Sequence, residues 1–214
     1  MVIVFAQSYI NSMLFWETPY VSALIVFSVV LLYGILHSVL ATKRAKQLAR
    51  AWGGEYAPRT FRLFYNLFAT VTLLPVLALP AMLPDQLLYE IPYPWTLLTS
   101  ALQLLAVLAL GAGVLQTGFW SFLGVRQLMM DKEDKPAHLV VSGLYSRVRH
   151  PLYTAGLIFI WLIPRMSVNF LALNLGLSLY LILGAMWEER KLVAEYGEAY
   201  VRYREQTPMF LPGF

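Results

Sequence analysis

The chain reads LYTAGLIFIWLIPRMSVNFLALNLGLSLYLILGAMW at residues 152–187, two apolar runs separated by a proline and an arginine. The second run, residues 168–187, has the length of about 20 apolar residues that a helix needs to cross a membrane. The first run, residues 152–163, has only about 12 residues, and at roughly 1.5 Å per residue it is shorter than the hydrocarbon core of a bilayer. We therefore expect a membrane hairpin whose first arm either begins earlier, within residues 143–150, or remains a half-span.

Three further apolar runs of membrane-spanning length precede this hairpin, at residues 20–41, 63–83 and 95–118. The chain of 214 residues is 59% hydrophobic and 13% charged, whereas soluble domains are about 25% charged. These features predict an all-α integral membrane bundle of about five transmembrane helices, in which the last two form a hairpin followed by a cytoplasmic tail helix. We expect one membrane domain, residues 1–214, with three spans in residues 1–118 and a ligand-binding core in residues 119–214.

The basic residues are concentrated in alternate connecting segments, at residues 42–62, 119–150 and 188–204. The loop at residues 84–94 carries only acidic charges. Because cytoplasmic loops carry an excess of Lys and Arg, this pattern predicts a multi-pass protein with its N-terminus outside and its C-terminus in the cytoplasm. Arg165, in the turn of the hairpin, is the exception. Topology thus explains the net charge of +4, so that we expect the lipid bilayer as a partner and no nucleic acid.

Two blocks of polar residues flank the hairpin, and both lie at the same membrane face if the hairpin forms. The first block, HLVVSGLYSRVRHPLYTAG, covers residues 138–156, and the second, EERKLVAEYGEAYVRY, covers residues 188–203. Ionisable residues at a bilayer boundary are costly unless they are paired or bind a ligand. We therefore expect a single candidate site built from both blocks.

The glutamate pair in the second block has two interpretations. Glu188 and Glu189 could simply begin a solvated tail. Adjacent helical residues point about 100° apart, so one carboxylate can face the bundle while the other faces water, and the sequence leaves open which one. A carboxylate in the site would pair with Arg147 or Arg149, or hold a cationic or hydroxyl-bearing ligand.

Aromatic and histidine residues allow similar alternatives. The second block carries three tyrosines on neighbouring helical faces, Tyr196, Tyr200 and Tyr203. They could form an interfacial belt or an aromatic wall for a base or a cation. His37 is an ionisable residue within the first span, and we expect a structural hydrogen bond to another helix, with Tyr65 or Asn66 as the partner, in preference to catalysis.

Several classes of site are excluded by what the sequence lacks. The chain has no cysteine, which removes disulfides, thiolate metal sites and cysteine nucleophiles. Its three histidines lack metal-ligand spacing, so we expect no metal. It contains no glycine-rich phosphate loop and no dinucleotide fingerprint.

Taken together, the two blocks resemble the C-terminal core of the isoprenylcysteine carboxyl methyltransferase family, over about residues 136–212. Phospholipid N-methyltransferases and bacterial methanethiol S-methyltransferases share this core. The resemblance implies an S-adenosylmethionine-dependent methyltransferase of bacterial type in the inner membrane, with its cofactor site on the cytoplasmic side. It also implies a lipid-soluble acceptor that enters from the bilayer: an isoprenylcysteine-like carboxylate, a lipid amine or a hydrophobic thiol. The oligomeric state stays open.

The resemblance also assigns roles to residues by position. The implied cofactor contacts are His138, Leu139, Val140, Gly143, Tyr145, His150, Pro151, Tyr153, Glu189 and Tyr200. The residues expected to act in catalysis are Arg149, Glu188 and Glu189, with Arg149 orienting a carboxylate or a substrate anion. The family tail typically reads Pro-Arg-Phe-x-Pro, whereas this chain has methionine at the second position, Met209. Met209 cannot make a charged contact, which weakens the case for an anionic acceptor at that point.

Two other functions remain open on the sequence alone. Membrane sterol reductases share a distantly related core, but an NADPH-dependent reductase would need a phosphate-binding cluster, for which Arg147, Arg149 and Arg202 are thin support. A non-catalytic membrane protein, such as an assembly factor or a small-molecule carrier, would tolerate alanine at His150 and Glu189 without losing a ligand.

Overall fold

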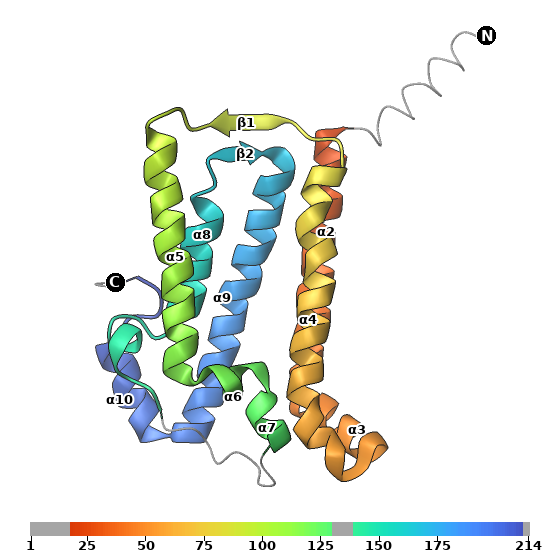
Figure 1. Cartoon of the computed structure of the whole chain (residues 1–214), viewed down its shortest axis with the longest axis vertical. Helices are drawn as coiled ribbons and strands as arrows, with labels where there is room; N and C mark the ends of the chain where they lie inside the picture. Colours follow the sequence, from red (N-terminus) through yellow and green to blue (C-terminus); the bar gives the residue numbers. More distant parts are fainter. Residues whose placement is uncertain (1–17, 130–138, 212–214) are drawn as a thin grey trace, which may run out of the picture.

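A computed structural model describes residues 18–129 and 139–211 of the chain. Its four longest helices are α2 (Pro19–Leu40), α4 (Ala57–Met82), α5 (Trp95–Thr117) and α9 (Val168–Tyr196). All four are long and apolar enough to cross a membrane, and they run along the length of the bundle (Figure 1). Many of their large apolar side chains lie on the surface, including Leu24 and Leu104, which are 64% and 60% exposed. Such a surface suits lipid rather than water, and the predicted all-α integral membrane bundle is confirmed.

The first arm of the predicted hairpin is a short helix. Helix α8 (Pro151–Trp161) has 11 residues, and the preceding turn of 3₁₀-helix, η2 (Gly143–Ser146), is separate from it. The backbone of His150 is not helical, with φ −122° and ψ 63°. Pro151 begins α8 because proline lacks an N–H and is tolerated at the first helical position. Of the two alternatives left by the sequence, the half-span is therefore correct, and α8 starts part-way along the bundle (Figure 1).

The two ends of the bundle differ in structure (Figure 1). One end, called here the α10 end, carries the short elements α3 (Lys43–Gly53), η1 (Gly54–Tyr56), α6 (Phe119–Leu123), α7 (Val125–Met129) and α10 (Glu198–Gln206). The other end, the strand end, carries β1 (Leu87–Glu90) and β2 (Arg165–Ser167), which pair antiparallel. There Nε of Arg165 lies 3.6 Å from a carboxylate oxygen of Glu90. The basic residue that departs from the charge pattern thus has an acidic neighbour.

Helices α2 and α9 pack closely against each other. Val26 and Val30 of α2 are buried together with Leu173 of α9. Gly176 of α9 lies directly against α2, because a Cβ at this position would be 2.8 Å from Cγ1 of Val30. Small residues of this kind let two membrane helices approach closely.

Helix α9 extends further than the hydropathy suggests. It continues without interruption through Glu188 and Glu189 to Tyr196, and it ends where Gly197 adopts a φ of +56°. Helix α10 follows directly. The expected boundary between a span ending at Trp187 and a separate tail is therefore wrong, because the glutamates lie within the long helix and the chain breaks only at the glycine, which tolerates positive φ.

Candidate active site

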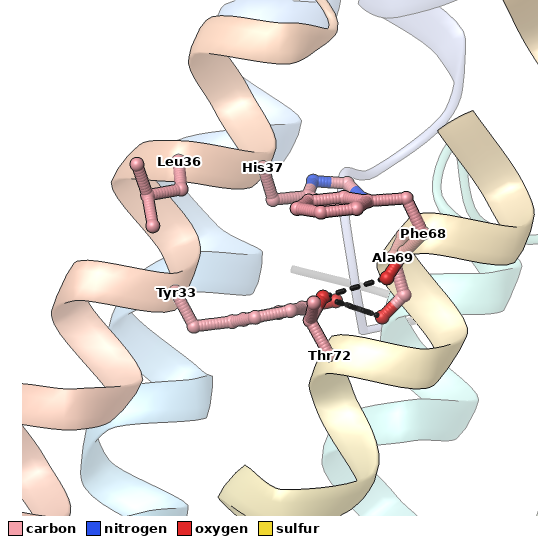
Figure 2. A pocket seen from close by; sticks show the side chains of 6 residues that line it. All are labelled: Tyr33, Leu36, His37, Phe68, Ala69 and Thr72. Atoms are coloured by element: carbon pink, nitrogen blue, oxygen red, sulfur yellow. Dashed lines mark hydrogen bonds between the residues drawn. The ribbon is translucent and has the colours of Figure 1, made fainter. Parts of the chain in front are cut away.

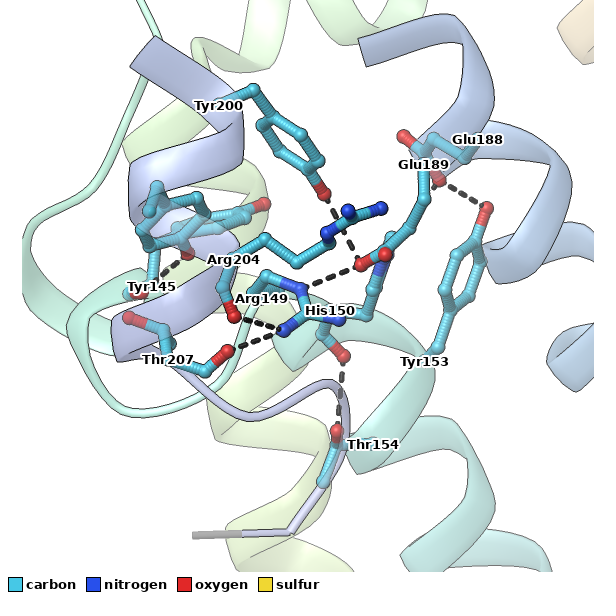
Figure 3. A network of polar contacts seen from close by, with 11 residues as sticks. Tyr145, Arg149, His150, Tyr153, Thr154, Glu188, Glu189, Tyr200, Arg204 and Thr207 are labelled. Carbon is cyan, nitrogen blue, oxygen red and sulfur yellow. Dashed lines mark hydrogen bonds and ion pairs between the residues drawn. The ribbon is translucent and has the colours of Figure 1, made fainter. Parts of the chain in front are cut away.

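Glu189 is the centre of a buried polar cluster at the α10 end (Figure 3). Its Oε1 accepts hydrogen bonds from Nε of Arg149 at 2.6 Å and from the hydroxyl of Tyr200 at 3.2 Å. The same oxygen lies 3.2 Å from Nε2 of His150. Glu189 is only 8% exposed, and burying a carboxylate is costly without such partners. The contacts join the segment before α8 to both α9 and α10.

Glu188 has a different environment from its neighbour. The hydroxyl of Tyr153 donates to Oε2 of Glu188 at 2.8 Å, and Nδ1 of His150 lies 3.8 Å from the same oxygen. The side chain of Glu188 is 45% exposed, whereas that of Glu189 is 11% exposed. The expected division between an inward and an outward carboxylate is confirmed, with Glu189 as the inward one. His150 lies between the two carboxylates, and its ring stacks on Tyr153 with the centroids 5.4 Å apart.

Arg149 is fixed by three groups on different parts of the chain. Besides Glu189, its Nη1 donates to the backbone carbonyl of Arg204 at 3.0 Å and to that of Thr207. The side chain of Arg149 is 10% exposed. Hydrogen bonds of this charge-assisted kind are stronger than neutral ones, so Arg149 holds the end of α10 against α9.

The chain after α10 lies along the residues that precede α8. The backbone N–H of Arg149 donates to the carbonyl of Pro208 at 2.9 Å, and that of His150 donates to the carbonyl of Met209 at 3.2 Å. Oγ1 of Thr154 donates to the carbonyl of Phe210 at 3.0 Å. The carbonyl of Met209 is a backbone group, so its hydrogen bond with His150 does not depend on the methionine side chain. The sequence analysis did not predict this pairing, nor the two backbone carbonyls that accept hydrogen bonds from Arg149. Backbone carbonyls are present at every residue, so no pattern of side chains could have indicated them.

The tyrosines of α10 face the protein interior. Tyr200 is 1% and Tyr203 is 9% exposed, and the hydroxyl of Tyr203 donates to the carbonyl of Tyr145 at 2.5 Å. Burial raises the pKa of the Tyr203 hydroxyl to about 12. Burial and the neighbouring Glu189 carboxylate raise the pKa of Tyr200. Both phenols are protonated near neutral pH and can donate hydrogen bonds. Because both side chains are buried, they do not form an interfacial belt, and that interpretation is wrong for Tyr200 and Tyr203.

The remaining expected site residues lie around this cluster rather than in it. Leu139 and Val140 are half-buried in the segment before η2, which has no regular secondary structure. Gly143 adopts a φ of +64°, and a Cβ there would lie 2.3 Å from Nε2 of Gln116, whose Oε1 accepts from the N–H of Leu144. Pro151 begins α8 and is buried. His138 lies outside the described residues. Across residues 18–129 and 139–211 no group of three or more acidic or histidine side chains is arranged to hold a metal ion.

His37 belongs to a second polar cluster, inside the membrane part of the bundle. The hydroxyl of Tyr65 lies 2.7 Å from Nε2 of His37, and the hydroxyl of Tyr180 lies 2.5 Å from Nδ1. The expected hydrogen bond from His37 to another helix is confirmed. Asn66 is not its partner, because its amide donates to the carbonyls of Phe122 and Leu123 at 2.8 and 3.0 Å.

Comparison with known proteins gives a consistent result. A methanethiol S-methyltransferase of Crocosphaera subtropica is 30% identical over 191 residues, 85% of this chain and 71% of that protein. A methanethiol S-methyltransferase of Mycobacterium tuberculosis is 30% identical over 202 residues, 88% of this chain and 78% of that protein. A protein-S-isoprenylcysteine O-methyltransferase of Schizosaccharomyces pombe is 31% identical over 90 residues, 40% of this chain and 37% of that protein.

No family model and no solved structure matches the chain. The similarity to the bacterial enzymes nevertheless runs through most of both chains, far beyond the two polar blocks. It confirms the family expected from those blocks. The chain belongs to the family of integral membrane methyltransferases that includes the methanethiol S-methyltransferases and, more distantly, the isoprenylcysteine carboxyl methyltransferases.

Proposed function

We propose that this protein transfers a methyl group from S-adenosylmethionine to a small hydrophobic thiol, and that the methyl donor binds at the α10 end beside Glu188. The observation that carries the proposal is the pair of adjacent carboxylates in unlike surroundings. Glu189 is buried and held by Arg149, His150 and Tyr200, whereas the side chain of Glu188 remains 45% exposed. Glu189 therefore has a structural role in the site, whereas Glu188 is accessible to a ligand.

The chemistry of these side chains fits the proposed donor. S-adenosylmethionine is a methyl-donating cofactor with a positively charged sulfonium and an amino group. Carboxylates attract such charges, and the faces of aromatic rings stabilise them. Oε2 of Glu188 accepts a hydrogen bond from the hydroxyl of Tyr153 at 2.8 Å, and the side chain of Glu188 is 45% exposed. The ring of Tyr153 stacks on His150 beside this carboxylate.

The roles that we propose for the chain follow from these positions. Glu188 would hold the positively charged amino group of the donor, which S-adenosylhomocysteine retains. Arg149 and Glu189 would act as positioning residues, because their contacts are with each other and with other groups of the chain. The residues lining the donor site would be Leu139, Val140, Gly143, Tyr145, His150, Pro151, Tyr153, Glu189 and Tyr200, together with His138. Holding the donor and the acceptor in one dry site lowers the barrier through orientation and desolvation.

The same contacts favour a methyl donor over NADPH. Arg149 would be needed to bind a phosphate, but its side chain is only 10% exposed and it is already bonded to Glu189 and two carbonyls. Arg147 and Arg202 are exposed. Arg149 neutralises Glu189, and Glu188 remains as a partly exposed negative charge. We infer that the site suits a positively charged ligand.

The thiol acceptor is inferred from the relatives. The bacterial relatives that match most of the chain are named methanethiol S-methyltransferases, whereas the isoprenylcysteine O-methyltransferase matches 40% of it. Met209 in place of a tail arginine agrees with an uncharged acceptor. In this proposal the basic residues of α3 and the connecting segments place the α10 end in the cytoplasm, where the donor is available.

Calorimetric titration of the detergent-purified protein with S-adenosylhomocysteine, the demethylated cofactor, tests the donor site. We expect saturable binding by the wild type and a loss of at least about tenfold in affinity for Glu188→Gln, since a charged hydrogen bond contributes about 1.5–3 kcal/mol. Glu90→Gln, which removes an exposed carboxylate at the strand end, is the matched control and should bind normally. No binding by folded wild-type protein, or binding of NADPH in its place, would contradict the proposal.

A further inference from the structure

Helix α3 connects the membrane helices α2 and α4 at the α10 end of the bundle (Figure 1). Its start is fixed by Thr42, whose Oγ1 donates to the carbonyl of Val39 at 2.7 Å and accepts from the N–H of Ala45 at 3.2 Å. Residues 41 and 42 alone separate α3 from the end of α2. Because α2 is a membrane-spanning helix, α3 lies at the boundary of the bilayer.

Apolar side chains of α3 are exposed at this boundary. Leu48 and Trp52 are 62% and 91% exposed, and Tyr56, which follows α3, is also exposed. On the side that packs against α4, Ala45 and Ala49 are half-buried. A basic helix with an exposed apolar side is typical of helices that lie in the headgroup region of a bilayer, where Trp and Tyr are enriched. The composition of α3 therefore suits a position at headgroup depth.

Basic side chains from three helices form a cluster beside α3, called here the basic cluster. Its members are Lys43 and Lys46 of α3, Arg62 of α4 and Lys191 of α9. The charged groups that act on Lys46 are the other members of the cluster, and all of them are cations. Partial burial, together with these neighbouring charges, lowers the pKa of the Lys46 ammonium. Since like charges repel, the basic cluster is stabilised by an anion that lies between its members.

Orientation in the membrane does not by itself account for this arrangement. The bias towards positive cytoplasmic loops depends on the number of Lys and Arg residues near the ends of the spans, and side chains that remain apart satisfy it equally well. Arg44 of α3 and Arg190 of α9 contribute to the same bias, yet neither is among the groups that act on Lys46. Basic groups that converge from separate membrane helices are typical of sites for anionic lipid headgroups.

The surface between α2 and α4 leads from the basic cluster towards the middle of the bundle. It contains a hollow of about 50 Å³, shown in Figure 2, that is lined by Tyr33, Leu36, His37, Phe68, Ala69 and Thr72. Ala69 follows Arg62 by about two turns of α4, a rise of about 10 Å, so both residues lie on the same side of that helix. Leu36 and Phe68 are 51% and 37% exposed. The hollow is therefore open to lipid, and its mainly apolar lining suits an acyl chain.

We propose that the basic cluster binds the phosphate group of an anionic phospholipid from the leaflet at the α10 end, and that an acyl chain of this lipid lies along the surface between α2 and α4. The negative charge of the phosphate is complementary to the cluster and relieves the repulsion within it. The apolar hollow lies where the chain runs from a headgroup held at Arg62. The proposal is independent of the methyl donor, because no member of the basic cluster is among the residues assigned to the donor site.

Native mass spectrometry of the detergent-purified protein tests this lipid site. We expect wild-type protein to retain a single molecule of phosphatidylglycerol saturably, and to bind the zwitterionic phosphatidylcholine at least about tenfold more weakly. The double variant Lys46→Gln, Lys191→Gln should lose at least about tenfold in affinity for phosphatidylglycerol, because two of the charges that face the phosphate are removed. Equal binding of the two lipids by wild-type protein would overturn the proposal.

The double variant Arg44→Gln, Arg190→Gln provides the matched control. It removes two positive charges from the same two helices, α3 and α9, but outside the basic cluster. This variant should bind phosphatidylglycerol as the wild type does. Equal losses of affinity in the two double variants would show a diffuse attraction to surface charge and would overturn the assignment of a site.

Competition with glycerol 3-phosphate separates a lipid from a free phosphate as the ligand. This soluble compound carries a phosphate group but has no acyl chain. We expect it to leave phosphatidylglycerol bound when both are present at the same concentration, because the chain contacts between α2 and α4 are made only by the lipid. Displacement of the lipid under these conditions would assign the basic cluster to a free phosphate and contradict the proposal.

Discussion

Arg149 and Glu189 form an ion pair that the fold has removed from solvent on both sides, with side-chain exposures of 10% and 11%. Each group also has further partners, so that the pair is hydrogen-bonded as a buried charge requires. Losing one member leaves the other buried and uncompensated. At the residue scale this pair is the most sensitive point of the site.

We expect Arg149→Met to lower the free energy of unfolding by about 3–5 kcal/mol, the usual cost of breaking a buried pair. Denaturant unfolding in detergent, followed by circular dichroism, measures this loss. Arg165→Met is the matched control, since Arg165 and Glu90 are 69% and 55% exposed and an exposed pair contributes at most about 1 kcal/mol. Equal losses in the two variants would show that the buried pair has no special importance.

Tyr203 gives a prediction for pH dependence. Its pKa is raised from the ordinary value near 10 to about 12 by burial, so the fold favours the protonated phenol. The resulting stability is complete below about pH 10 and is lost as the pH rises towards 12. Difference absorbance between wild type and Tyr203→Phe should show one tyrosine that ionises near pH 12. Complete ionisation by pH 10 would contradict the burial of this hydroxyl.

The sequence predicts the two-sided glutamate pair but not which glutamate is buried. Adjacent helical residues must diverge, and this alone separates Glu188 from Glu189. The choice between them depends on the rotation of α9 about its axis, and α9 is packed closely against α2 at Gly176 and Val30. A contact between residues so far apart in the sequence leaves no local pattern, and so this part of the site required the structure.

At the scale of the elements, the two glycines of α9 at positions 176 and 184 give a matched pair of tests. We expect Gly176→Ala to destabilise the protein by about 1–3 kcal/mol, because its Cβ would lie 2.8 Å from Val30 and overpacking costs this much. Gly184 has no heavy atom within 4 Å of an added Cβ, so Gly184→Ala should be neutral or stabilise by up to about 1 kcal/mol.

Thermal unfolding of the two variants in the same detergent makes the comparison. If both substitutions have the same effect, the close packing of α2 on α9 is not what limits this interface, and the rotation of α9 must be set elsewhere. If only Gly176→Ala also loses affinity for S-adenosylhomocysteine, the helix contact and the polar site are coupled as the fold suggests.

The elements were only partly predictable. Hydropathy located the four long helices, because a run of about 20 apolar residues indicates a membrane-spanning helix. It placed the end of α9 too early, since Glu188 to Tyr196 is polar yet composed mainly of good helix formers, and Gly197 is the first residue that breaks the helix. The pairing of residues 207–210 with the segment before α8 uses backbone groups alone and therefore carries no sequence signal.

At the scale of the whole molecule, the orientation in the membrane is a proposal that can be tested directly, because the chain has no native cysteine. We expect a cysteine introduced by Arg44→Cys in α3 to be protected from a membrane-impermeant maleimide in intact cells and labelled after lysis. A cysteine introduced by Glu90→Cys at the strand end should be labelled in intact cells. The reverse pattern would place the α10 end outside and contradict the proposed location of the donor site.

The most direct test of the proposed function is product formation by the purified protein. S-adenosylmethionine with a deuterated methyl group is incubated with ethanethiol, and the headspace is analysed by mass spectrometry. We predict ethyl methyl sulfide that carries the deuterated methyl group, formed by wild-type protein and by Glu90→Gln but reduced at least about tenfold in Glu188→Gln. Absence of the labelled thioether with wild-type protein that binds S-adenosylhomocysteine would contradict the thiol as acceptor, and equal rates in all three proteins would contradict the site.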